Sequence, residues 1–210
     1  NYLLFFPGSR PAHFAAFSLL CLDSINYLLD AHPDLHVIFS IPSSIPEDLV
    51  LTFTQQASKL DRVFILKGES LDFMAISKLM VSLPGTNTAE AMYMKCPMIT
   101  VAPLNKPELI SLDGLLGLFV KIPFLGKLLM AVIIRYLKRK IRFVSLPNKI
   151  HNKPIVPEFI KVFTPLELFQ CINSYYSHED KLSNIKESLQ LCSQTKRTDE
   201  YIISKLFDKF

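Results

Sequence analysis

The sequence lacks the cysteine spacing that binds metal ions. Its four cysteines are far apart and form no CxxC or Cys/His pattern; they are Cys21, Cys96, Cys171 and Cys192. Three of them lie in predicted helices, where a reduced cysteine behaves as a small apolar residue. We therefore expect no structural metal ion, and the cysteine usage is typical of a protein from a reducing, cytosolic setting.

Charged residues are also scarce. They make up 20% of the 210 residues, whereas apolar residues make up 50%, so a sizeable core can be buried and a disordered chain is excluded. The net charge of +4 is modest and does not by itself indicate nucleic-acid binding. No internal repeat or low-complexity tract is present. The length fits one large α/β domain, or one and a half small ones.

The chain starts without methionine and without the features of a signal peptide. It opens at Asn1 and runs directly into the apolar stretch Tyr2–Phe6, without a basic region or a cleavage site. We expect a piece from the middle of a longer protein, cut where the first strand of a second domain begins. The alternative is a complete small protein.

The sequence shows no catalytic triad. Its five histidines are scattered, and only His13 lies close to another candidate residue, three positions after Arg10. Ser9 is not part of a GxSxG elbow, so a hydrolase nucleophile is not expected.

Apolar stretches of strand length alternate with helical patterns along the first half of the chain. The expected strands are Tyr2–Phe6, His36–Ile41, Arg62–Lys67, Leu79–Leu83 and Ile99–Ala102, and the expected helices are Ala12–Asp30, Pro46–Lys59, Ser70–Ser77 and a short one after Gly85. This alternation predicts the α/β class, a Rossmann-like parallel sheet with helices on both faces. Further on, Arg142–Leu146 is interpreted as a returning strand, and residues 164–210 as helical.

Two turns follow predicted strands and suit a phosphate. In PGSR, at residues 7–10, Ser9 can donate to a phosphate and Arg10 can bind it through two nitrogens. Taken alone this signal is weak, since Pro-Gly is an ordinary turn. Parallel sheets bind ligands at the carboxyl ends of their strands. This turn and a second one, at residues 84–98, both lie at such ends, where a ligand is expected.

The second turn, at residues 84–98 (PGTNTAEAMYMKCPM), is the stronger signal. Gly85 lets the backbone turn sharply, and Thr86 or Thr88 can cap a helix whose positive end faces the loop. Glu90 then lies on the first helical turn, where it can accept a sugar hydroxyl. The alternative is a plain connection in which threonine merely caps the helix. Two such turns on one sheet edge favour a shared diphosphate.

A long apolar stretch at 109–144 ends in a basic cluster of Arg135, Lys138, Arg139, Lys140 and Arg142. We favour a membrane-surface element, in which apolar side chains enter the acyl boundary and basic ones meet anionic lipid. Two core helices with a solvated basic end are the main alternative. A transmembrane helix at 115–136 is less favoured, because lysines and a proline interrupt it. Nucleic acid is a poor fourth, because aromatic residues do not interleave with the basic ones.

Three motifs in the same order and spacing resemble the nucleotide-binding half of the lipid-A-disaccharide synthase family. They are PGSR, GTNTAEAMYMKCPMI at 85–99 and FVSLPNKIHNKPIVPEFI at 143–160, and the likeness covers residues 3–160. The family is a GT-B glycosyltransferase of two domains. It transfers N-acetylglucosamine-type sugars from a UDP donor to a lipid-linked acceptor at the cytoplasmic membrane face, without a metal.

The resemblance assigns roles to named residues. It implies that Ser9 and Arg10 contact the donor diphosphate. We expect Arg10 to be catalytic, because Arg10 and the helix dipole behind Gly85 can stabilise the charge that develops on the departing UDP. The loop beneath the diphosphate would contain Gly85, Thr86 and Thr88. Glu90 would bind the ribose hydroxyls, Asn148 would line the same cleft, and the backbone at 66–68 would lie near the uracil. The acceptor and the candidate base belong mainly to the other domain, which is absent here.

This sequence departs from the family at three places. His13 replaces an acidic residue, Pro84 replaces the serine of the SGTxxLE loop, and the segment 103–129 is longer than its counterpart. In these features it is more similar to the related proteins of cyanobacteria, so the acceptor lipid can differ from a lipid A precursor.

The sequence thus predicts three parts. Residues 1–163 form the donor-binding domain, with a membrane-proximal insertion at 104–142, and residues 164–210 form helices that pack on it. The resemblance implies a cytoplasmic, peripheral membrane hexosyltransferase of lipid A biosynthesis that binds a UDP-sugar and a lipid acceptor, with no cofactor and no nucleic acid. A nucleotide-sugar epimerase and a non-catalytic membrane module with a degenerate site are the alternatives.

Overall fold

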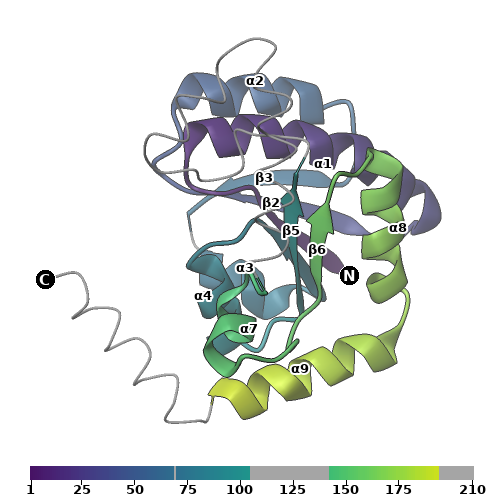
Figure 1. The fold of residues 1–210 in the computed structure, drawn as a ribbon. Coiled ribbons are helices and arrows are strands. Elements are labelled where there is room, and N and C mark those ends of the chain that lie inside the picture. Colours follow the sequence, from purple (N-terminus) through teal and green to yellow (C-terminus); the bar gives the residue numbers. More distant parts are fainter. Residues whose placement is uncertain (69, 105–141, 194–210) are drawn as a thin grey trace, which may run out of the picture.

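The computed structural model describes residues 1–68, 70–104 and 142–193, and its centre is a six-stranded sheet (Figure 1). Its strands are β1 (Tyr2–Phe6), β2 (His36–Ile41), β3 (Val63–Lys67), β4 (Leu79–Ser82), β5 (Met98–Pro103) and β6 (Glu158–Lys161). Their order is β3-β2-β1-β4-β5-β6, and every neighbouring pair is parallel. The predicted Rossmann-like sheet is confirmed.

The central strands are apolar at successive positions because both faces of the sheet are covered. Leu3 and Phe5 of β1 point into one core cluster, and Leu4 and Phe6 point into the other. The same alternation continues in the neighbouring strand, where Met80 faces the second core and its sequence neighbours face the first. A sheet with two apolar faces needs a helical layer on each.

The helices divide into these two layers, as Figure 1 shows. One face carries α1 (Pro11–Ala31), α2 (Glu47–Ala57) and α8 (Pro165–Tyr176); the other carries α3 (Ser70–Ile76), α4 (Asn87–Tyr93) and α7 (Leu146–His151). The last described helix is α9 (Glu179–Ser193). Its Leu182 packs in the first core, and its Ile185 and Leu189 pack in the second. It therefore joins the two layers.

Helix α1 has the length and the apolar composition of a membrane-spanning helix. In the fold it is a core helix, because Phe14, Phe17, Ile25 and Leu28 are almost completely buried. Its carboxyl end is bound by Arg62, whose guanidinium donates to four backbone carbonyls, those of Leu29, His32, Pro33 and Leu35. A cation at this end also opposes the negative end of the helix dipole.

The predicted strands and helices of the first hundred residues agree with the structure to within one or two residues. The predicted returning strand at 142–146 is wrong. Residues 142–145 pair with no strand, and Leu146 begins α7. The backbone N–H groups of Val144 and Ser145 donate to the carboxylate of Glu158, at 2.8–3.1 Å, so they are not available to a sheet ladder. The strand that returns to the sheet is β6.

The proposed membrane-proximal insertion lies outside the described residues, apart from its two ends. At one end Leu104 is buried and its N–H donates to Lys161 O at 3.1 Å. At the other end Arg142 donates to Asn152 Oδ1 at 3.1 Å. The predicted C-terminal helices are confirmed as far as Ser193.

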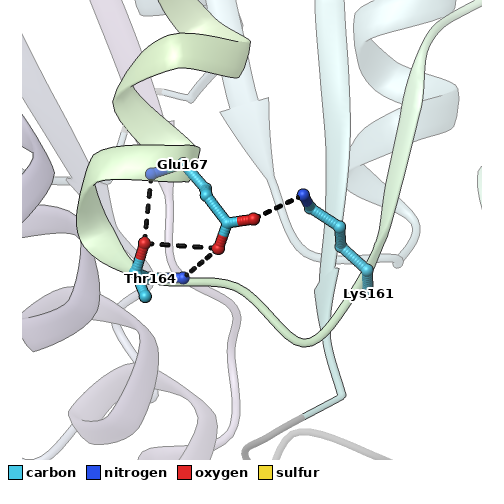
Figure 2. A network of polar contacts seen from close by, with 3 residues as sticks. All are labelled: Lys161, Thr164 and Glu167. Atoms are coloured by element: carbon cyan, nitrogen blue, oxygen red, sulfur yellow. Dashed lines mark hydrogen bonds and ion pairs between the residues drawn. The ribbon is translucent and has the colours of Figure 1, made fainter.

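A capping box starts α8 where the chain leaves the sheet (Figure 2). Thr164 Oγ1 accepts from the Glu167 N–H at 3.3 Å, and the Glu167 carboxylate accepts from the Thr164 N–H at 2.9 Å. Lys161, on β6, donates to the same carboxylate at 2.7 Å. These contacts fix the angle between β6 and α8.

We predict that Glu167→Gln lowers the thermal midpoint slightly at pH 7 and by less at about pH 3. The hydrogen bond from Lys161, followed by that from the Thr164 N–H, holds the pKa of Glu167 below its usual value. A carboxylate with a lowered folded-state pKa stabilises the fold above its unfolded-state pKa, and this stabilisation is lost as the pH falls through the folded-state pKa. Thermal melts at both pH values test this. Glu187→Gln, at an exposed glutamate of α9, should have no effect at either.

Candidate functional site

A pocket of about 540 Å³ lies at the carboxyl ends of β1, β2 and β4. Here the order of strands reverses: the chain continues from β1 to β2 on one side and reaches β4 on the other. Crevices at such reversal points are the usual ligand sites of open parallel sheets, because the helices that follow the two strands leave on opposite faces. The site predicted from the two turns therefore coincides with a pocket.

The β1–α1 turn forms one wall. Gly8 has a φ of +95°, and a Cβ there would lie 3.3 Å from Leu83 Cδ1 and 3.4 Å from His13 Cβ, so only glycine fits without strain. Arg10 is the N-cap of α1, and Pro11 is at its first position. Ser9, Arg10 and His13 all line the pocket, next to the positive end of a 21-residue helix.

The β4–α4 turn forms the opposite wall. Pro84, Gly85 and Thr86 are exposed at the pocket, and Glu90 is half-buried beside them. Thr86, one of the two predicted capping residues, occupies the N-cap position of α4, but its side chain makes no capping bond. Gly85 does not have a positive φ, and a Cβ there would meet only the end of the Asn87 side chain, 2.8 Å from Oδ1, so the turn does not depend on glycine as we expected.

The ends of β2 and β3 supply a third wall, of which only the backbone at 66–68 was predicted. It contains Ser40, Pro42, Ser43, Gly68 and Ser70. Neighbouring Ser44 donates through Oγ to Ser9 O at 3.1 Å, and the Gly68 N–H donates to Ile41 O at 3.1 Å, so this wall is bonded to the first. The available signal was positional, because every strand of a parallel sheet ends at the same edge. Of the backbone expected near uracil, Gly68 reaches the pocket.

The structure does not bring Thr88 and Asn148 into the pocket. Thr88 is fully buried; its Oγ1 donates to Gly85 O at 2.7 Å and accepts from the Leu146 N–H at 3.1 Å. Thr88 therefore joins α4 to α7 and supports the loop from behind. The motif correctly predicted that Thr88 lies next to the loop, but it did not predict which way the Thr88 side chain points.

Asn148 is 1% exposed and acts as a structural hub. Its Oδ1 accepts from the N–H groups of Ile155 and Val156 at 2.7 and 2.9 Å. Its Nδ2 donates to Val156 O and to Glu158 Oε1, both at 2.9 Å. The amide holds the turn between α7 and β6, which corrects the expectation that it lines the cleft.

The cysteines do not provide a nucleophile. Burial raises the pKa of the Cys96 thiol, behind α4, to about 12 and that of Cys171 to about 11, and it also raises the pKa values of Cys21 and Cys192. Because the thiolate is the reactive form, these thiols are inert at neutral pH. Within residues 1–68, 70–104 and 142–193, no three His, Cys, Asp or Glu side chains gather in a way that could hold a metal ion.

A family model described as lipid-A-disaccharide synthetase matches residues 1–110. Among curated relatives, lipid-A-disaccharide synthase 2 of Legionella pneumophila (strain Lens) is 28% identical over 157 residues, 74% of this chain and 34% of the relative. Lipid-A-disaccharide synthase of Aeromonas hydrophila is 28% identical over 182 residues, 86% and 42% respectively. The chain thus spans less than half the length of these relatives.

Two solved structures share the fold. A co-structure of S. aureus MnaA with UDP aligns with a TM-score of 0.56 and 10% identity, covering 89% of this chain and 39% of the other. A putative UDP-N-acetylglucosamine 2-epimerase from Listeria monocytogenes aligns with a TM-score of 0.55 and 8% identity, with the same coverage. At these identities the likeness establishes the Rossmann-like fold alone.

We predict that Asn148→Ala lowers the free energy of unfolding by about 2–4 kcal/mol, since it removes four hydrogen bonds and leaves two backbone N–H groups without their acceptor. Chemical denaturation measures this change. Lys149→Ala, at an exposed position on the same helix, should change stability by less than about 0.5 kcal/mol. Equal stability of the two variants would contradict the structural role of Asn148.

Proposed function

We propose that this chain, which belongs to the lipid-A-disaccharide synthetase family, is the donor-binding half of a glycosyltransferase that uses a UDP-sugar. The proposed reaction transfers a hexosamine-type sugar to a lipid-linked acceptor. One observation carries the proposal: Arg10 and Glu90, from opposite sides of the strand reversal, line a single pocket together with Ser9, Gly85 and Thr86.

The two charges suit the two ends of a nucleoside diphosphate. A guanidinium binds phosphate oxygens through parallel N–H donors, whereas a carboxylate accepts hydrogen bonds from ribose hydroxyls. The sharp β1–α1 turn lets the diphosphate approach the backbone of Gly8 and Ser9, and the hydroxyl of Ser9 adds a donor. The pocket can thus hold a diphosphate and a ribose at the same time.

Arg10 has the catalytic role in this proposal. As the acceptor bonds to the sugar, the bond between the sugar and the β-phosphate oxygen of UDP breaks, and negative charge develops on that phosphate. A positioned cation lowers the free energy of that transition state. The positive end of α1 acts in the same direction. Because these groups belong to the chain, the proposal needs no metal ion.

The second helix contributes less than its motif implied. Helix α4 has only seven residues. The N–H groups of Thr88, Ala89 and Glu90 already donate to the carbonyls of Gly85 and Thr86 at 2.9–3.2 Å. They are therefore committed to the turn, and we assign most of the charge stabilisation to Arg10 and α1.

A nucleotide-sugar epimerase is the main alternative, since one of the structural neighbours carries that description. The family match and the curated relatives favour the transferase, whereas the neighbours at 8–10% identity support only a common fold. We further propose that the enzyme is cytoplasmic and peripheral on the inner, or equivalent, membrane, where a lipid acceptor is found. The basic cluster at 135–142 supports this location.

We predict that Arg10→Ala weakens UDP binding by about 10- to 100-fold, the loss expected for a charge-assisted pair, and leaves uridine binding unchanged. Glu90→Ala should weaken the binding of both UDP and uridine, because both ligands carry the ribose. Isothermal titration calorimetry measures the four affinities. Arg142→Ala and Glu187→Ala, at exposed positions outside the pocket, are the matched controls. If Arg10→Ala lowered the affinities for UDP and uridine equally, a role of Arg10 in binding the diphosphate would be contradicted.

We predict that the chain floats with vesicles containing phosphatidylglycerol and that replacing Arg135, Lys138, Arg139 and Lys140 by glutamine largely abolishes flotation. Each basic side chain near an anionic surface contributes about 1 kcal/mol. Vesicles of phosphatidylcholine alone are the lipid control, and unchanged UDP affinity of the variant shows that its fold is intact. Flotation that survives the substitutions would contradict the membrane role of the cluster, and no flotation at all would favour a solution epimerase.

A further inference from the structure

The geometry points to Ser70 as the residue that positions the Glu90 carboxylate. Ser70 Oγ lies 3.5 Å from Glu90 Oε2, and both residues line the pocket from different helices, α3 and α4. We propose that this contact orients the carboxylate to accept both hydroxyls of a ribose. The inference rests on the proposed function, since it deepens the role given there to Glu90.

Ser70 is held at the pocket by elements on either side of it. Gly68, with a φ of +81°, turns the chain at the end of β3, and its N–H is bonded to Ile41 O at 3.1 Å. The helix that Ser70 begins is anchored in the core by Met74, which is 1% exposed. The hydroxyl therefore reaches the pocket from a supported position.

Glu90 is held with similar firmness. The residues after it, Ala91 and Met92, are completely buried. Thr88, one half-turn before it, bonds α4 to the start of α7. The backbone of Glu90 is thus fixed, and the remaining freedom lies in its side-chain torsions.

The contact with Ser70 restricts that freedom. In the part of the chain that the structure describes, it is the one hydrogen bond to the Glu90 carboxylate. A hydroxyl occupies one lone pair of Oε2, which leaves both carboxylate oxygens able to accept from a vicinal diol. At 3.5 Å the bond is at the long limit, as polar contacts of a binding site commonly are before the ligand arrives.

This arrangement predicts a specificity for ribose that depends on Ser70. Ser70→Ala should weaken UDP binding about tenfold, the effect of losing a hydrogen bond to a charged group, and weaken 2′-deoxy-UDP much less. The preference for UDP over 2′-deoxy-UDP therefore shrinks. Ser70→Thr, which keeps the hydroxyl, should restore it. Ser43→Ala removes another pocket serine, on the wall after β2, and should leave the preference unchanged.

The test is calorimetry of the 210-residue chain with UDP and 2′-deoxy-UDP, for the wild type, Ser70→Ala, Ser70→Thr, Ser43→Ala, Glu90→Ala and the Ser70→Ala/Glu90→Ala pair. We expect Ser70→Ala to have no further effect once Glu90 is alanine. An undiminished preference in Ser70→Ala overturns the inference and leaves the proposed function standing. A further loss in the double variant overturns it too, since Ser70 would then act independently of Glu90. A wild type that binds no UDP overturns the proposed function and, with it, this inference.

Discussion

The site depends on the position of β1 at the centre of a parallel sheet. Leu3, Leu4 and Phe5 are completely buried, and the strand pairs with β2 on one side and β4 on the other. Because the strands on its two sides are followed by helices on opposite faces, the carboxyl end of β1 opens into a crevice. The turn at Gly8 can be tight only because no side chain has to fit between it and Leu83. The crevice is therefore a consequence of topology, and the site chemistry is built on its rim.

A second interaction, the carboxylate of Glu158, organises the half of the sheet beyond β4. It accepts from two backbone N–H groups, from the Ser145 hydroxyl at 2.6 Å and from Asn148. These bonds place the start of α7 so that the Leu146 N–H meets Thr88 Oγ1. Thr88 in turn supports the helix that carries Glu90. A carboxylate outside the pocket thus acts through three contacts on the wall that we propose binds ribose.

The sequence predicted the part of this arrangement that depends on periodicity. Apolar stretches such as His36–Ile41 are typical of central strands, and the strand ends then fall on one edge. For this reason Ser9, Arg10, Gly85, Thr86 and Glu90 were predicted to lie together, and all five line the pocket. The sequence did not predict the roles of side chains that turn inward. Thr88 and Asn148 lie in the right motifs, but whether a hydroxyl or an amide faces a ligand or the backbone depends on distant partners such as Leu146 and Val156. The stretch at 142–146 was misread for the same reason, since extended apolar residues pair as a strand only if their N–H groups are not already bonded to a carboxylate.

The charge pattern of the pocket restricts what it can hold. Arg10 and the positive end of α1 lie on one side of the strand reversal, and Glu90 lies on the other. A free phosphate would gain from the first side and be repelled by the second, whereas an uncharged nucleoside would gain little from Arg10. A ligand with a diphosphate at one end and hydroxyl donors at the other satisfies both sides, because its anionic oxygens and its diol are separated along one molecule.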